Sequence, residues 1–251
     1  AALRALAYQP LALGEQRDVI RRVALEGLRR LFIPHLVPLV ASGMVGYKLA
    51  EGLVNRYGLD QRRLMVARQG LPYNKTTTMD LDLWALAQAI QAEAASRAVL
   101  VEQQPAELAT RYRAGTLPGV LQDGMAAFLS RYGHRGVREI DVGVPRWAEE
   151  PGYLFGVLQS YLALEDPEAA PDRHFARQAA AAEAAVADLV AQARRLPGGW
   201  YKAPQLGFFL RRYRQLGGLR ETPKFYMMWM FQGLRDMLLA AGRQLVEFDA
   251  L

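Results

Sequence analysis

The chain has 251 residues, 51% of them hydrophobic and 22% charged, a composition that excludes wholesale disorder, and its net charge of +6 permits binding to polyanions. The absence of cysteine excludes disulfides, thiolate catalysis and zinc–sulfur sites, and three scattered histidines leave little for a metal site, so we expect no bound metal. The longest apolar run, residues 31–40, is too short and too Pro-broken to span a bilayer, and without a signal peptide we expect a soluble cytoplasmic protein.

Apolar residues recur at helical spacing in the first part of the chain, which predicts helices over about residues 14–30 and 40–57. Two prolines between these segments interrupt the pattern. Gly58 follows the second helix and is expected to be its left-handed stop. Gly43 and Gly46 lie inside that helix, where we expect them to permit close contact with another helix.

Residues 69–78 are rich in turn formers and form a predicted loop that leads into a helix. Thr77 or Thr78 can cap this helix, because a Thr oxygen accepts from an orphan N–H group of the first turn. Asp80 and Asp82 would then lie in the first turn, where the helix dipole favours carboxylates. The segment is either a polar loop that faces a ligand or a well-capped helix start.

The later helices are separated by breaks rich in proline and glycine. Helical patterns are expected from this loop toward residue 104 and over about 106–114, 120–132, 151–164, 172–196 and 204–216. Asp172 can cap the long Ala-rich helix, whose polar face suits an arm or a lid over a pocket. We therefore expect an all-α protein, an irregular domain of about nine helices with at most one short strand.

Residues 134–147 are the one extended, non-helical stretch of note. Ile140, Val142 and Val144 alternate with polar or small residues, which predicts a short strand or a pinned loop. Arginines and carboxylates in this stretch predict a buried ion network, because charges inside a fold must be paired; the alternative is charge presented to a neighbouring domain. His134 has the chemistry of a general base or phosphate carrier, but its context favours a structural role.

A polar joint at residues 217–225 is the best candidate for chemistry. Thr222 can cap a helix that begins at the proline after it, and the apolar run that follows predicts a buried helix. Arg220 and Lys224 flank this helix start, where free N–H groups, the dipole and two cations together favour a phosphate. If the helix runs through the joint, four-residue spacing still places both cations on one face; the structural alternative pairs them with Glu221 and its neighbours.

Three stretches together resemble the middle region of phosphoenolpyruvate synthase-like dikinases, especially rifampicin phosphotransferases. They are GLPYNKTTTM at residues 70–79, YGHRGVREID at 132–141 with PRW at 145–147, and LRETPKF at 219–225. Their order and spacing also match, and the resemblance extends over about residues 40–251.

In that family an ATP-grasp domain and a swivelling phosphohistidine domain flank a helical domain, which in rifampicin phosphotransferases binds the antibiotic. A pyrophosphoryl group passes from ATP to the histidine, and a phosphoryl group then passes to a hydroxyl of the acceptor. The resemblance implies that residues 1–251 are a single helical acceptor-binding domain, a fragment of a larger ATP-dependent phosphotransferase. Arg220 and Lys224 match the family's cations that assist transfer. The expected acceptor contacts are Asn74, Thr76, Thr77, Phe225 and Met228.

The chain has no ATP-grasp phosphate loop and no swivelling-domain histidine motif. We therefore expect it to bind an acceptor without turnover and to bind no cofactor itself, with ATP and Mg²⁺ implied for the parent enzyme. The expected partners are a small, hydrophobic acceptor such as a rifamycin and the ATP-grasp and phosphohistidine domains, with no membrane and no nucleic acid. Antibiotic resistance would follow for the rifampicin branch. The alternative is a non-catalytic helical binding or scaffold domain that holds an anionic partner on a basic surface.

Overall fold

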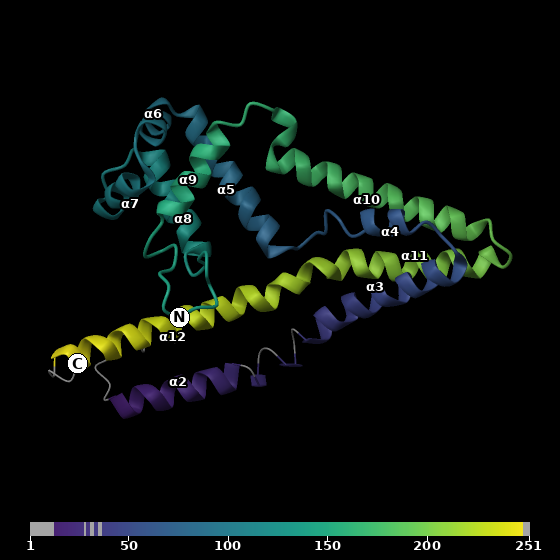
Figure 1. Cartoon of the computed structure of the whole chain (residues 1–251), viewed down its shortest axis with the longest axis horizontal. Helices are drawn as coiled ribbons and strands as arrows, with labels where there is room; N and C mark the ends of the chain where they lie inside the picture. The colour runs from purple at the N-terminus through teal and green to yellow at the C-terminus, as the bar shows by residue number, and fades with distance from the viewer. Residues whose placement is uncertain (1–12, 28, 31–32, 35–36, 248–251) are drawn as a thin grey trace. The chain divides into compact units, whose positions relative to one another are not determined.

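The computed structural model describes residues 13–27, 29–30, 33–34 and 37–247, so His35 and one residue of the first predicted helix lie outside it. The described part is all-α, as predicted, and contains no strand (Figure 1). Its α-helices are α2 (Leu13–Gly27), α3 (Val37–Tyr57), α4 (Gln61–Val66), α5 (Lys75–Ala92), α6 (Ala94–Glu102), α7 (Pro105–Ala114), α8 (Gly119–Tyr132), α9 (Gly152–Leu162), α10 (Pro171–Arg194), α11 (Gly199–Leu216) and α12 (Glu221–Glu247). Two short 3-10 helices, η2 (Pro167–Ala169) and η3 (Gly217–Arg220), complete the set.

The chain forms two compact units, which we describe separately. Unit 1 takes its described residues from Ala1–Ile33, Asp82–Ala163 and Lys224–Leu251. Unit 2 is built from Pro34–Leu81 and Leu164–Pro223. Helices α5 and α12 each contribute residues to both units. Among the described helices, none combines the length and apolar character needed to cross a bilayer.

Unit 2 is organised around the contact between α3 and α11, which run side by side (Figure 1). The expected role of the glycines in α3 is confirmed. A Cβ atom on Gly46 would lie 3.4 Å from the carbonyl oxygen of Phe209, and one on Gly43 would lie 3.1 Å from Leu216 Cβ. Small residues at these positions therefore let the two helix backbones approach closely.

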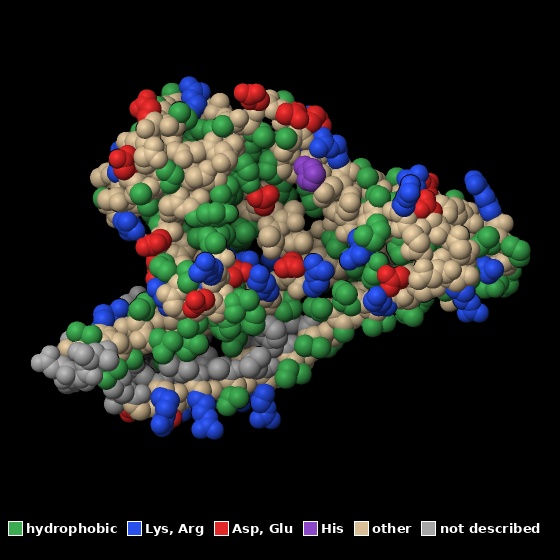
Figure 2. All heavy atoms as spheres, viewed as in Figure 1, with side chains coloured by type: hydrophobic (Ala, Val, Ile, Leu, Met, Phe, Trp, Pro, Cys, Tyr) green, Lys and Arg blue, Asp and Glu red, His purple; other side chains and the backbone are tan. Residues whose placement is uncertain are grey.

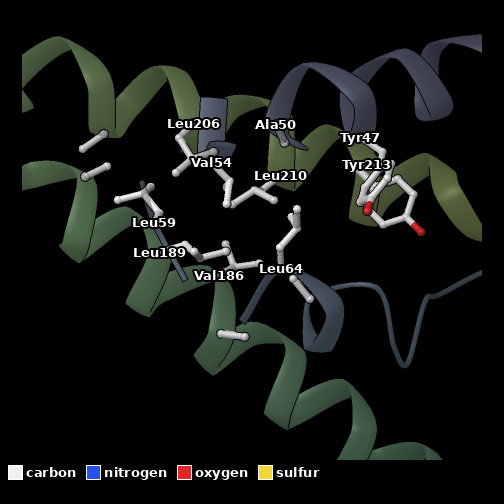
Figure 3. Packing of buried hydrophobic residues seen from close by; sticks show 14 residues of the cluster. Tyr47, Ala50, Val54, Leu59, Leu64, Val186, Leu189, Leu206, Leu210 and Tyr213 are labelled. Carbon is white, nitrogen blue, oxygen red and sulfur yellow. The ribbon is translucent and has the colours of Figure 1, made fainter. Parts of the chain in front are cut away.

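The core of unit 2 joins α3, α4, α10 and α11 (Figure 3). Its labelled members are Tyr47, Ala50, Val54, Leu59, Leu64, Val186, Leu189, Leu206, Leu210 and Tyr213. The helical periodicity of these residues places them on one stripe of each helix, and burying those stripes against one another provides the main stabilisation of the unit.

The core of unit 1 is formed largely by α6, α7, α8 and α9, with α7 packed on α9 and α6 on α8 and α9. The fully buried side chains Leu100, Leu121, Met125, Leu154 and Phe155 come from these helices. Some polar side chains inside unit 1 hydrogen-bond to backbone groups. For example, the Gln159 amide donates to the carbonyl oxygens of Leu100 and Gln103, each at 2.8 Å.

Several helix boundaries differ from prediction because caps compete locally. Helix α5 is capped by Asn74, and not by Thr77 or Thr78, so Asp80 and Asp82 lie beyond its first turn. The predicted Ala-rich helix toward residue 104 is two helices, because the Glu93 carboxylate caps α6. These extra starts, together with the unpredicted α4, explain why the described part has eleven α-helices where about nine were expected.

Proline and glycine also set boundaries that spacing alone misplaced. Pro171 opens α10, so Asp172 lies inside its first turn and does not cap it. Helix α11 begins at Gly199, and Pro204 lies just past its first turn, where the helix loses a single backbone hydrogen bond. Gly58 has a φ of 65°, which confirms the left-handed stop of α3. Gly133 ends α8 with a right-handed φ, and its role is close approach: a Cβ there would lie 2.8 Å from Ala148 Cβ.

Candidate functional site

The segment we call the Gly70 loop, residues 67–74, has a backbone that few sequences can adopt. Both Gly70 and Tyr73 have positive φ angles, 53° and 62°. A Cβ atom on Gly70 would lie 2.3 Å from the backbone nitrogen of Ala179 in α10, so glycine is required there by space as well as by φ. Tyr73 is 68% exposed, and an exposed aromatic residue held in the left-handed region is the kind of local strain that concentrates at binding sites.

Arg214 of α11 holds this loop in place. Its buried guanidinium donates to the carbonyl oxygens of Ala67, Gln69 and Gly70 at 3.2, 2.9 and 3.3 Å, and its Nε pairs with Glu183 of α10. Charge-assisted bonds to three carbonyls fix the path of the loop backbone. Sequence reasoning missed Arg214, although a signal existed: it lies four residues after buried Leu210, on the apolar stripe of α11.

The Gly217–Gly218 pair of the polar joint packs against the same loop. A Cβ atom on Gly218 would lie 1.9 Å from the carbonyl oxygen of Pro72, and one on Gly217 would lie 3.2 Å from Leu71 Cδ1. At Gly218 any other residue type would therefore displace the loop backbone, whereas at Gly217 a Cβ would crowd mainly the Tyr213 ring, 2.8 Å away. The Gly70 loop and the Gly217–Gly218 pair, which are almost 150 residues apart in the chain, are therefore brought together within unit 2.

A groove of about 570 Å³ lies beside the Gly70 loop. Its walls include Pro72 and Tyr73 of the loop, Phe175 and Ala180 of α10, and Arg211 and Arg214 of α11. The groove is thus mainly apolar, with a few cationic and polar groups, the combination that small-molecule sites commonly show. The Ala-rich helix α10 was expected to suit an arm or a lid over a pocket, whereas nothing in the spacing of the sequence indicated that α11 would supply a wall.

The predicted acceptor contacts of unit 2 lie at the start of α5, directly after the loop. Asn74 Oδ1 accepts from the backbone N–H groups of Thr76 and Thr77, at 3.0 and 3.2 Å, and the Thr78 hydroxyl donates to the Asn74 carbonyl oxygen at 3.0 Å. The Asn74 side chain therefore has a structural task as helix cap. Thr76 is exposed and Thr77 is half-buried, and contact of these residues with an acceptor stays a prediction.

The joint itself is helical throughout, which corrects the predicted cap. The 3-10 helix η3 ends at Arg220 and α12 begins at Glu221, so Thr222 lies inside a helix and does not start one. The Glu221 amide already donates to the carbonyl oxygens of Gly218 and Leu219. In this described segment, no helix therefore starts at Pro223 with free N–H groups that could bind a phosphate. Of the two predicted arrangements, the one in which the helix continues through the joint is correct.

Arg220 and Lys224 make different ion pairs. The Arg220 guanidinium is 57% exposed and pairs with Glu221, Nη2 to Oε1 at 3.2 Å, as the structural alternative expected. An exposed pair of this kind contributes little stability, so Arg220 can exchange it for another anion at low cost. Lys224 lies in unit 1, where its Nζ is 2.7 Å from Glu139 Oε1.

Glu139 is the buried centre of an ion network. Its carboxylate also accepts from Arg135, and its backbone carbonyl accepts from Arg146 Nη1 at 2.8 Å. Burial by itself would raise the pKa of Glu139, but hydrogen bonds from Lys224 and Arg135 outweigh it and hold the pKa below its ordinary value. Glu139 is therefore ionised at neutral pH and fixes the position of the Lys224 ammonium group.

A second pair in unit 1 pins the rest of the extended stretch. Arg235 of α12 donates to both oxygens of Glu149 and to the carbonyl oxygen of Val142, at 2.8 to 3.1 Å. The hydrogen bonds from Arg235 and from the Arg146 amide lower the pKa of Glu149 against the effect of its burial. The predicted buried ion network is thus confirmed, and of the two backbone predictions the pinned loop is correct, since no strand occurs in the described residues.

The aromatic residues of α12 surround His134 within unit 1. The His134 ring lies 4.6 Å from the rings of both Phe225 and Trp229, and it is buried, which agrees with a structural role. Met228 is fully buried, Phe225 is half-buried and Tyr226 is exposed, so the expectation of a wholly buried helix holds only in part. Acceptor contacts by Phe225 and Met228 stay predictions.

Asp82 and Tyr132 form a further polar pair in unit 1. Asp82 accepts from the Tyr132 hydroxyl and from Arg131 Nη1, each at 2.8 Å. Burial, together with the hydrogen bond to Asp82, raises the pKa of Tyr132 to about 12. Across the described residues, no group of three or more His, Asp or Glu side chains is placed to hold a metal ion.

Comparison with known proteins identifies the family. Residues 35–221 match the family described as the rifampicin phosphotransferase fourth domain. The rifampicin phosphotransferase of Streptomyces sviceus is 32% identical over 130 residues, which are 52% of this chain and 15% of that protein. That of Bacillus subtilis (strain 168) is 29% identical over 126 residues, 50% of this chain and 14% of that protein.

A relative with a different name also matches. The prodigiosin synthesizing transferase PigC of Serratia marcescens is 28% identical over 108 residues, 41% of this chain and 11% of that protein. The matched region is thus no more than about a sixth of the length of these relatives. The family match covers the Gly70 loop, its Arg214 clamp and the ion network of residues 135–149, and the chain belongs to the rifampicin phosphotransferase fourth-domain family.

Proposed function

We propose that this chain is the acceptor-binding helical domain of an ATP-dependent phosphotransferase. In this proposal a phosphohistidine on another domain donates a phosphoryl group to a hydroxyl of a small, hydrophobic acceptor held here. The observation that carries the proposal is the apolar groove beside the Gly70 loop, which lies inside the matched family region. Its walls exclude water from an apolar ligand, and its few cationic groups can orient polar substituents.

The groove is preformed, which supports a binding role. Arg214 fixes three carbonyl groups of the Gly70 loop, and the glycines at 70, 217 and 218 are required by close contacts. A ligand that enters therefore does not have to order the loop, and binding loses less conformational entropy. Tyr73, exposed and held at a positive φ, offers an aromatic ring at the edge of the groove.

Arg220 and Lys224 would assist transfer by electrostatic stabilisation. Phosphoryl transfer spreads negative charge over the equatorial oxygens, and positioned cations lower its barrier without covalent chemistry. Arg220 can leave its exposed pair with Glu221, whereas Lys224 is held by the buried Glu139. The phosphohistidine, ATP and Mg²⁺ belong to other domains in this proposal, so the chain alone binds without turnover.

The test is to measure binding of a panel of rifamycins to the chain by thermal shift and by calorimetry. Saturable binding at micromolar ligand should stabilise the fold by about 1–3 kcal/mol through mass action. Ala180→Trp fills the groove from an exposed position on α10, and Ala181→Trp is the matched control outside the groove. We expect the first variant to abolish binding and the second to retain it.

Two outcomes would refute this assignment. Absence of a shift with every rifamycin would remove the hydrophobic antibiotic as acceptor. Equal binding by the Ala180→Trp variant would show that the ligand lies elsewhere. An Arg220→Ala/Lys224→Ala double variant should bind nearly normally, because these residues act on the transferring group and not on the acceptor in our proposal.

A further inference from the structure

A second pocket in unit 2 lies at the other end of the α3–α11 pair, and we call it the Tyr57 pocket. It has a volume of about 690 Å³ and is lined by Leu53, Arg56 and Tyr57 of α3 and by Tyr201, Lys202 and Gln205 of α11. None of these residues lines the groove beside the Gly70 loop. The pocket is thus a separate feature, outside the proposed acceptor site.

The polar groups of the Tyr57 pocket are mostly hydrogen-bond donors, and most of them have no acceptor among the lining residues. The Tyr57 hydroxyl donates to Gln205 Oε1 at 3.3 Å, which occupies the acceptor end of that amide and leaves its NH₂ group to donate. Arg56 and Lys202 add two cations, and none of the described carboxylates lines the pocket. Such a set of donors is complementary to an acceptor-rich anion, of which phosphate is the best match.

The Lys202 ammonium group is held in position by aromatic rings. Its Nζ lies 5.0 Å from the centre of the Tyr57 ring and 6.0 Å from that of Tyr201. These contacts restrict the side chain while leaving its charge unneutralised. Within the described part of the chain, neither Lys202 nor Arg56 takes part in an ion pair, so both remain available to an anion.

The surroundings raise the positive potential of this end of unit 2. Residues 55–66 and 186–205 carry six basic side chains and two acidic ones, Asp60 and Asp188. Both acids are engaged: Asp60 caps α4, and Asp188 pairs with Arg63 at 3.3 Å. Basic side chains are prominent on the visible face of α10 and α11 at this end (Figure 2). The excess charge steers anions toward the pocket.

Apolar surface lies next to the cations. Leu53 and the Tyr201 ring form part of the wall, and the Trp200 ring, 84% exposed, lies 5.3 Å from that of Tyr201. A free inorganic ion would leave this surface unused, whereas a phosphate ester with an aromatic or apolar group would cover it. We propose that the Tyr57 pocket binds an organic phosphate, with Arg56, Lys202 and the Gln205 amide on the phosphate.

The test is calorimetric titration of the intact chain with AMP as the organic phosphate, at about 0.15 M salt so that diffuse surface attraction is screened. Adenosine and inorganic phosphate are the matched probes that each lack one half of the ligand. We expect saturable AMP binding that is at least about tenfold tighter than either half-ligand. Lys202→Met and Arg56→Met should each weaken it about tenfold, and Arg62→Met, an exposed cation outside the pocket, should not.

The proposal is overturned if AMP fails to saturate at about 1 mM, or if Arg62→Met weakens binding as much as Lys202→Met does. Equal affinity for AMP and inorganic phosphate would also overturn it, because the apolar wall would then be unused. A single-stranded oligonucleotide that binds with a steep salt dependence and loses affinity equally in all three variants would show a diffuse basic surface instead. Thermal unfolding of each variant checks that the fold is intact.

The outcome is independent of the proposed acceptor site. The Ala180→Trp variant should keep AMP binding, and the Lys202→Met variant should keep rifamycin binding. Loss of both ligands in either variant would indicate a folding defect, which the unfolding measurement detects.

Discussion

Arg214→Met should both destabilise the chain and loosen the Gly70 loop. The wild-type guanidinium donates to three loop carbonyl groups, and each such bond contributes about 1 kcal/mol net. The pair with Glu183 adds little, because that carboxylate side chain is 65% exposed. Met keeps most of the buried volume, so the free energy of unfolding should fall by about 2–4 kcal/mol.

The measurement is urea unfolding of the variant, with hydrogen exchange of the amides of residues 68–74. A loss of this size lowers Tm by about 5–12 °C for a chain of this length. Arg212→Met is the matched control, because Arg212 is exposed on the same helix and its guanidinium lies 5.6 Å from the Phe208 ring, with no loop carbonyl group among its hydrogen-bond partners in the described residues. It should cost less than about 0.5 kcal/mol.

Arg214→Lys separates charge from geometry. Lysine keeps the positive charge but lacks the planar fork that reaches three carbonyl groups at once, so it should recover less than half of the lost stability. A loss below about 1 kcal/mol in Arg214→Met, or unchanged exchange in the Gly70 loop, would refute the clamp. Rifamycin affinity should fall in parallel with loop protection if the loop forms a wall of the acceptor site.

Three further changes test other parts of the fold. Gly70→Ala should lower the free energy of unfolding by more than about 2 kcal/mol in urea titration, since its Cβ would meet Ala179 and its φ is positive. Glu139→Gln should lower the free energy of unfolding by about 2–4 kcal/mol at pH 7 and make it depend less on pH in acid. The paired carboxylate stabilises the fold above its ordinary pKa of 4.5, and this stabilisation is lost as the pH falls through the lower pKa of the folded state. Tyr132 should ionise near pH 12 in an ultraviolet titration. Because its pKa is raised from 10.0 in the folded state, its contribution to the free energy of unfolding is complete below pH 10 and is lost as the pH rises toward 12. Tyr132→Phe should remove this loss of stability.

Local sequence patterns determined the helical fold class and most helix positions. Periodic apolar residues placed α3, α8, α9 and α10 within a few residues of their observed bounds, because an amphipathic stripe must face a core wherever the helix lies. The left-handed stop at Gly58 and the ion network around Glu139 were predicted for equally local reasons. The three family stretches were also recognisable without any coordinates.

Helix starts were less predictable, because neighbouring residues compete to satisfy the same N–H groups. Asn74 caps α5 in place of the predicted Thr77 or Thr78, and Glu93 caps a helix start that the sequence pattern did not indicate. Pro171 opens α10 at its first position, one residue before the predicted cap Asp172. At the joint, Thr222 and Pro223 have the residue types of a helix start, yet η3 runs directly into α12. Alternative helix starts differ in free energy by only about 1 kcal/mol. The packing of the flanking residues can therefore decide between them.

The candidate sites arise from tertiary packing, which brings together residues that are far apart in the chain. The Arg214 clamp joins a guanidinium to carbonyl groups 144 to 147 residues earlier in the chain, and both pockets take their walls from helices that are distant in sequence. Backbone carbonyl groups carry no residue identity, so no pattern of side chains could have indicated that they would converge on one arginine. Local residue patterns were sufficient to predict most of the helices and the family, whereas the packing of α3, α10 and α11 placed the two pockets.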